Sequence, residues 1–90
     1  MTETTTYRLV MQATAKKSLR AVPKKDAARL ITALQQVAAD PFASHSFAKK
    51  LQGEDGYRVR KGDWRAVYEI DRAAKTVRVL KIAKRARVYR

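Results

Sequence analysis

Three arginines around one predicted β-hairpin are the residues best suited to chemistry. Arg58 and Arg60 alternate with apolar residues before the Gly62-Asp63 pair, and Arg65 follows it. Gly and Asp favour a tight turn, so these flanks are predicted to be two paired strands. Side chains two apart on a strand share a face, and Arg65 would reach the same surface from the partner strand. Guanidinium groups so close repel one another unless an anion lies among them, and arginine binds phosphate bidentately. The cluster predicts a phosphate-bearing ligand.

Further basic and aromatic residues are predicted to extend this site. Arg85 and Tyr89, near the C-terminus, join the candidate catalytic group. Aromatic rings stack on unpaired bases, so the mixture suits single-stranded RNA better than a duplex groove. The additional predicted RNA contacts are Lys49, Lys50, Lys61, Trp64, Lys84 and Arg87.

This residue set could also cleave RNA. Attack by the RNA's own 2′-OH passes through a phosphorane with extra negative charge on its non-bridging oxygens. Preorganised guanidinium groups stabilise that charge more than the ground state, which is the condition for catalysis. The reaction also needs a base for the 2′-OH proton and an acid for the leaving 5′-oxygen. Tyr89 and a cationic side chain of lowered pKa are the nearby candidates.

Charge and composition narrow the classes of function. The 90 residues hold 21 Lys and Arg against 8 Asp and Glu, a net charge of +13, which indicates a polyanionic partner such as nucleic acid or an acidic protein. There is no cysteine, and the single histidine, His45, lies in a serine-flanked segment. We therefore predict no metal site, no cofactor and no Ser/His nucleophile. No apolar run reaches 18 residues, so we expect a cytoplasmic protein without membrane contact.

The chain predicts a single α+β domain over residues 1–90. We expect an N-terminal strand over 5–12, a two-helix antiparallel hairpin, and three antiparallel strands that form a small twisted sheet. The first helix spans 15–22 with Thr14 as its cap, and the second ends at Asp40-Pro41. Residues 41–55 are predicted to be a loop anchored in the core by three apolar residues. These anchors are Phe42, Phe47 and Leu51.

The last strand is predicted over 76–83, where apolar and basic residues alternate. Strict alternation puts Val77, Val79 and Lys81 on one face and Leu80 and Ile82 on the other.

Several short motifs together resemble the RelE family of bacterial toxins, in the RelE/ParE superfamily of toxin–antitoxin systems. The resemblance runs from Tyr7 to Arg90. Its motifs are Lys16 to Arg20, Asp40-Pro41, Leu51-Gln52-Gly53, the run from Tyr57 to Tyr68, and the closing run from Lys84 to Tyr89. It implies the RelE-like microbial RNase fold.

The resemblance implies a ribosome-dependent endoribonuclease, an mRNA interferase that cuts message in the ribosomal A site and so inhibits translation. The family's two basic strand positions correspond to Arg58 and Arg60, its arginine after the turn to Arg65, and its terminal pair to Arg85 and Tyr89. The best-known members carry lysines at the strand positions. Arginine clamps phosphate well but shuttles protons poorly, so the general base is left open.

The family also implies a cognate antitoxin that holds the toxin inactive. The positive charge predicts that this partner has an acidic, partly disordered segment, which folds into the groove between the helical hairpin and the sheet. The other partners are the ribosome and mRNA, and DNA would be contacted only through the antitoxin. Two alternatives stay open: a ParE-like toxin that inhibits DNA gyrase, and a non-catalytic nucleic-acid-binding module.

Overall fold

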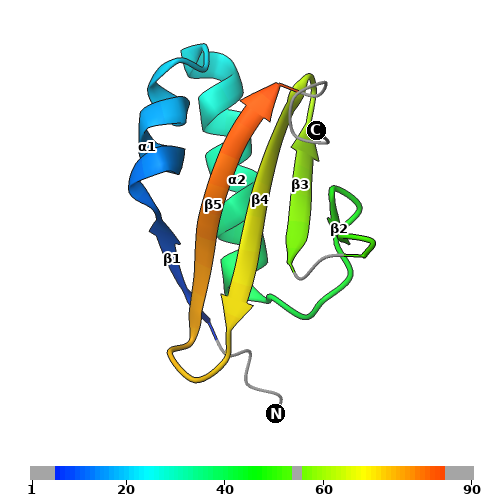
Figure 1. Ribbon diagram of the computed structural model, residues 1–90. Coiled ribbons are helices and arrows are strands. Elements are labelled where there is room, and N and C mark those ends of the chain that lie inside the picture. Colours follow the sequence, from blue (N-terminus) through cyan, green and yellow to red (C-terminus); the bar gives the residue numbers. More distant parts are fainter. Residues whose placement is uncertain (1–5, 54–55, 85–90) are drawn as a thin grey trace.

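The described chain forms one five-stranded sheet with two helices. The computed structural model describes residues 6–53 and 56–84. Its elements are β1 (Arg8–Met11), α1 (Ala13–Arg20), α2 (Lys24–Ala39), β2 (Ala48–Lys50), β3 (Tyr57–Lys61), β4 (Trp64–Asp71) and β5 (Thr76–Lys84) (Figure 1). The strand order is β1-β5-β4-β3-β2, in which β1 runs parallel to β5 and the other pairs are antiparallel. The predicted α+β fold is confirmed.

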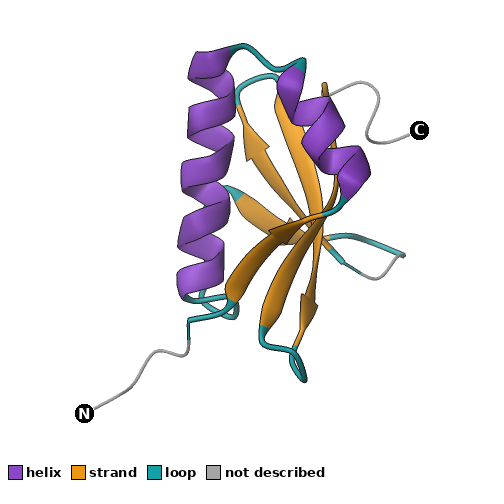
Figure 2. Ribbon diagram, turned by 90° about the vertical axis from the view of Figure 1, so that its left-hand side faces the viewer, coloured by secondary structure: helices purple, strands orange, loops and turns teal. Residues whose placement is uncertain are grey.

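Helix α2 covers one face of the sheet, as the side view in Figure 2 shows. It carries apolar residues at three- and four-residue spacing, so one side of the helix can bury them together. The core combines this side, the strand residues that face it and three residues outside them: Leu30, Ala33, Leu34, Val37, Ala38, Val59, Ala66, Tyr68, Val77, Val79 and Ile82, with Tyr7, Ala15 and Val22. The opposite face of the sheet, called the open face below, carries no helix within the described ranges.

Both ends of α2 follow local rules. Asp26 lies in its first turn, where the helix dipole favours a negative charge. The helix ends at Ala39, and Asp40 is its C-cap directly before Pro41. The predicted stop at Asp40-Pro41 is therefore confirmed.

The start of α1 differs from the prediction. Its N-cap is Gln12, and Thr14 lies inside the helix. The Thr14 hydroxyl instead donates a hydrogen bond of 3.2 Å to the Leu80 carbonyl of β5. The Gln12 amide donates to the Val79 carbonyl at 3.0 Å. Thr14 was wrongly predicted as a cap because its partner lies 66 residues away.

The segment between α2 and β3 is more ordered than the predicted loop. Residues Ala48–Lys50 form the edge strand β2, paired antiparallel with β3. Phe47 packs against the core, but Phe42 is 51% exposed. The prediction of Phe42 as a core anchor was wrong: its ring contacts Tyr7 edge-on and lies under the Arg72 guanidinium on the surface.

A bulge changes the facing of β5. The register with β4 shifts between Val67 and Tyr68, so that Val67 pairs with Lys81 and Tyr68 pairs with Val79. Leu80 is the extra residue at this shift. Ile82 consequently joins Val77 and Val79 in the core, while Lys81 is exposed on the open face. The strictly alternating prediction for this strand was wrong beyond Leu80.

Candidate functional site

The strand register gathers basic side chains on the open face. Arg60 pairs directly with Arg65 across the β3–β4 hairpin. Two pairs further from the turn, Arg58 lies between Lys49 of β2 and Val67 of β4. Val67 in turn pairs with Lys81 of β5. Residues opposite each other in an antiparallel pair share a face. We call these five basic residues, Lys49, Arg58, Arg60, Arg65 and Lys81, the basic cluster.

The cluster members differ in accessibility. Arg60, Lys49 and Lys81 are exposed, and Arg58 is half-buried. Arg65 is only 2% exposed. Its Nη1 donates to the carbonyls of Gly62 and Trp64, each at 3.3 Å. Arg65 therefore braces the turn that carries Arg60, and the exposed positive charge of the cluster comes from its other members.

Lys81 was missed by the sequence analysis as a member of this site. The alternation in β5 assigned it to the face of Val77 and Val79, and only the bulge at Leu80 brings it beside Val67. No local signal marks that bulge, because the residues around Leu80 all suit a regular strand.

A carboxylate–arginine network occupies the other end of the open face. Glu69 of β4 pairs with Arg78 of β5 in the register, and Arg78 Nη1 lies 2.5 Å from Glu69 Oε1. Arg78 Nη2 also lies 3.5 Å from Asp71 Oδ2. The hydrogen bond to Glu69, together with the nearby negative charges, raises the pKa of Arg78. Positive charge thus gathers at the turn end of the face, and carboxylates lie beyond it.

Three other predicted RNA contacts lie on the α2 side of the sheet. Lys61 pairs with Trp64, and Trp64 pairs with Lys84, in register positions that alternate with Arg60 and Arg65. The Trp64 indole Nε1 donates to Asp26 Oδ2 at 3.1 Å, which ties the hairpin to the first turn of α2. These residues are therefore separated from the basic cluster by the sheet itself.

The basic groups on the α2 side meet aromatic rings. The Lys84 ammonium lies 5.8 Å from the Trp64 ring centroid, and the Lys61 ammonium lies 4.9 Å from that of Phe47. Both are cation–π distances. Lys50 is exposed and pairs with Tyr57 on this same side.

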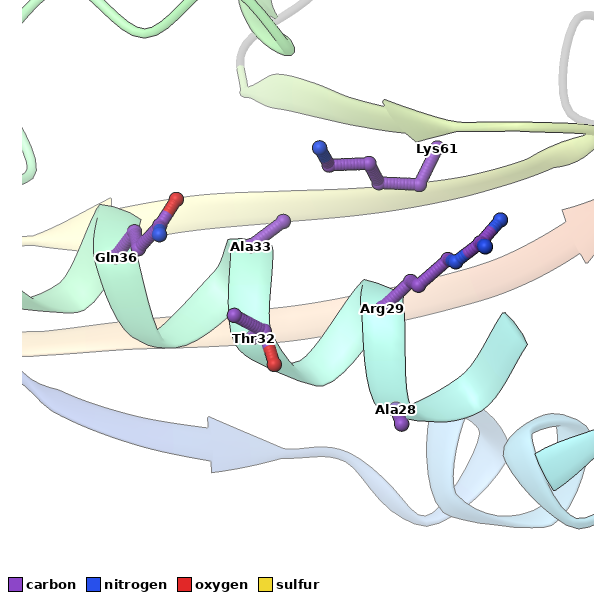
Figure 3. Close-up of a pocket in the computed structure, with 6 residues that line it drawn as sticks. All are labelled: Ala28, Arg29, Thr32, Ala33, Gln36 and Lys61. Atoms are coloured by element: carbon purple, nitrogen blue, oxygen red, sulfur yellow. The ribbon is translucent and has the colours of Figure 1, made fainter. Parts of the chain in front are cut away.

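A shallow cleft of about 250 Å³ opens between α2 and β3. Figure 3 shows Arg29 reaching from the helix and Lys61 from the strand, with Ala33 beside them on the helix. Its lining residues are Ala28, Arg29, Thr32, Ala33, Gln36 and Lys61. Small residues beside two cations suit a partner segment that carries carboxylates.

Tyr57 and Tyr68 stack beneath the hairpin on the α2 side. Their rings lie 5.3 Å apart at an interplanar angle of 13°. Burial, followed by the neighbouring Tyr57, raises the pKa of Tyr68 well above that of free tyrosine. Tyr68 is therefore a protonated core residue at neutral pH.

Part of the predicted site falls outside the described residues: Arg85, Arg87 and Tyr89.

Within the described ranges no group of three or more His, Cys, Asp or Glu residues could hold a metal ion. His45 Nε2 donates a 2.9 Å hydrogen bond to the Asp40 carbonyl. No helix in the described part of the chain is long and apolar enough to cross a membrane.

Comparison with known proteins identifies the family of this chain. The family model described as ParE toxin of type II toxin-antitoxin system, parDE, matches residues 9–89. No curated protein sequence gives a match.

Solved structures of toxins match over nearly the whole chain. The archaeal RelE-RelB complex from Pyrococcus horikoshii matches with a TM-score of 0.77 and 30% identity, covering 92% of this chain and 99% of that one. The toxin-antitoxin complex RelBE2 from Mycobacterium tuberculosis matches with a TM-score of 0.76 and 25% identity, covering 93% and 97%. The isolated RelE toxin of E. coli matches with a TM-score of 0.77 and 26% identity, covering 92% and 90%. The chain therefore belongs to the ParE toxin family of type II toxin–antitoxin systems, within the RelE/ParE superfamily.

Proposed function

We propose that this toxin is an endoribonuclease that cleaves mRNA in the ribosomal A site and so inhibits translation. The observation that carries the proposal is the basic cluster on the open face. Lys49, Arg58 and Lys81 lie in one row across four strands, with Val67 of β4 between Arg58 and Lys81, and Arg60 extends the row toward the turn. A sheet face of this kind suits a single RNA strand, whose phosphates meet the cations.

The proposed chemistry is attack by the RNA 2′-OH on the adjacent phosphate. Arg58 and Arg60 lie two residues apart on one strand, so their guanidinium groups can approach the same phosphodiester. They bind the phosphorane more strongly than the diester because the phosphorane carries more negative charge. Arg65 supports them from within the turn. Arg85 and Tyr89 remain predicted members of the catalytic group, and Arg87 a predicted RNA contact.

An antitoxin is the proposed regulatory partner. The RelBE2, RelE-RelB and RelBE structures similar to this chain are complexes with antitoxins. The net charge of +13 favours a partner with an acidic segment. The cleft with Arg29 and Lys61 is the place in the groove between α2 and the sheet where carboxylates would dock.

The test is primer extension on a defined message with purified toxin, with and without programmed ribosomes. We expect cuts within codons that appear only with ribosomes. Arg58→Ala and Arg60→Ala should each lower the cleavage rate by about 10²-fold or more, the loss typical of one preorganised charge donor. Arg20→Ala is the matched control, because it removes the same charge from an exposed position on α1. Equal cleavage by all three variants would remove the basic cluster from the mechanism.

Inhibition of DNA gyrase is the second candidate, and it is favoured by the match to the ParE family. A gyrase inhibitor has no need of the basic cluster on its open face. If primer extension gives no cuts under either condition, a supercoiling assay with purified gyrase decides between inhibition of that enzyme and simple nucleic-acid binding. If the protein binds RNA but neither cuts it nor inhibits gyrase, the result would indicate the non-catalytic nucleic-acid-binding module.

A further inference from the structure

Cleavage by the 2′-OH requires a group that accepts a proton, and the arginines of the basic cluster are not suited to this. Arginine has a pKa above about 12 and remains protonated at neutral pH. An efficient general base is available in its unprotonated form at the working pH and readily releases the proton that it accepts. On the described part of the open face, the carboxylates are Glu69 and Asp71.

Glu69 borders the basic cluster. It follows Val67 by two residues on β4, and Val67 pairs with both Arg58 and Lys81. Glu69 is thus the diagonal neighbour of Arg58 across the β3–β4 ladder, at a separation of about 7–8 Å for such pairs. A phosphate held by Arg58 would leave the neighbouring ribose within reach of the Glu69 carboxylate. Asp71 lies two pairs further away, opposite Thr76.

The Glu69 carboxylate is oriented and accessible at once. Its side chain is 43% exposed, while Arg78 Nη1 of the neighbouring strand β5 contacts Oε1. Asp71 Oδ2 lies 3.5 Å from Nη2 at the other end of the same guanidinium. A base that a third group orients is a recurring arrangement in active sites that activate a hydroxyl.

We propose that Glu69 is the general base of the cleavage reaction, an assignment that rests on the endoribonuclease function proposed above. The Glu69 carboxylate takes the proton from the 2′-OH as the 2′-oxygen forms its bond to phosphorus. The bond from phosphorus to the 5′-oxygen breaks, and the 5′-oxygen takes a proton from water. Glu69 then returns its proton to solvent. The products are a 2′,3′-cyclic phosphate and a free 5′-OH, with no net gain or loss of protons.

A carboxylate acts as a general base only in its ionised form, so the assignment predicts a pH dependence. Glu69 faces Arg58 on β3, Arg78 and Lys81 on β5, and Asp71 on its own strand. If Glu69 is the base, acidification lowers the cleavage rate. A variant without this carboxylate lacks that acid limb.

The test compares Glu69→Gln with Asp71→Asn. Each change removes one negative charge from a partner of Arg78, but only Glu69 borders Arg58. Single-turnover cleavage is measured with saturating programmed ribosomes, alongside toxin affinity for those ribosomes and the melting temperature. Glu69→Gln should lower the cleavage rate by about 10²–10⁴-fold, the usual contribution of a general base, with unchanged affinity. Asp71→Asn should cleave at close to the wild-type rate.

Glu69→Asp keeps the assignment testable if the glutamine variant fails to fold. It should retain part of the activity together with the acid limb of the pH–rate profile. If the wild-type toxin cleaves and Glu69→Gln cleaves at the same rate with the same acid limb, Glu69 is not the general base. The endoribonuclease function is then unaffected. Absence of cleavage by the wild-type toxin overturns that function, and the assignment with it.

Discussion

Arg60 of β3 and Arg65 of β4 are paired directly across their hairpin, so two side chains of like charge occupy opposite positions on one face of the sheet. Such a pair destabilises a sheet. The buried Arg65 bonds to the carbonyls of its own turn, whereas Arg60 remains exposed. The arrangement is unfavourable for folding and favourable for binding an anion.

Replacing Arg60 should therefore stabilise the protein. Arg60→Thr is expected to raise the free energy of unfolding by about 0.2–1 kcal/mol relative to its control, because it removes a like charge from a directly opposed position. The control is Arg8→Thr, an exposed strand arginine that pairs with Thr76. Urea unfolding of both variants measures the difference. Equal changes in the two variants would show that the Arg60–Arg65 pair is not repulsive.

The hydrogen bond between Trp64 and Asp26 should couple the hairpin to α2. A double-mutant cycle with Trp64→Phe and Asp26→Ala is expected to give an interaction energy of about 1–2 kcal/mol, because the acceptor is charged and the bond only part-buried. Thermal or urea unfolding of the four proteins gives this value. A second cycle, with Asp26→Ala and Tyr7→Phe, joins residues with no mutual hydrogen bond and should give a value near zero. Coupling near zero in both cycles would contradict the role assigned to Trp64.

The exposed position of Phe42 makes a clear contrast with the core. Phe42→Ala should cost about 1 kcal/mol, since the ring loses only its edge contact with Tyr7 and its cation–π contact with Arg72. Leu34→Ala should cost about 2–5 kcal/mol, because Leu34 is fully buried beneath the sheet. Denaturant unfolding ranks the two variants. The reverse order would restore Phe42 as a core anchor.

Burial of Tyr68 should make the protein sensitive to alkali. The folded state raises the pKa of Tyr68, so its contribution to stability is complete below the ordinary tyrosine value of about 10 and is lost as the pH rises above it. The loss for this one group approaches about 1.4 kcal/mol per pH unit. Tyr68→Phe should lose less stability than wild type between neutral pH and pH above about 10. The free energy of unfolding of both proteins is measured across this pH range. Parallel curves of stability against pH for the two proteins would contradict the raised pKa of Tyr68.

Local sequence signals were sufficient for much of the fold. The Gly62-Asp63 turn, the hairpin around it and the stop at Asp40-Pro41 all depend on residues close in sequence. The strand β2 was missed because Ala48–Lys50 has no alternating pattern and becomes a strand only by pairing with β3. The bulge at Leu80 was missed because it depends on the pairing of β5 with β4.

The site shows the same division between local and distant information. The common face of Arg58 and Arg60 follows from their spacing. Lys61 and Trp64 were grouped with them by residue type, although alternation along the strands already assigns them to the other face. Glu69 was overlooked although it follows Arg65 by four residues, which is even spacing on one strand. Only the register shows how it meets Arg58.

The pairing of β1 with β5 also determines the order in which the protein can fold. The hydrogen-bonding partners of Arg8–Met11 are residues 76–79, and the first turn of α1 bonds to the same strand. During synthesis, β1 therefore remains without its partner strand until β5, the last of the described elements, has been made. Contacts between such distant segments slow folding. Helix α2 and the β3–β4 hairpin depend on residues close in sequence, whereas β1 can join the sheet only after β5 has been made.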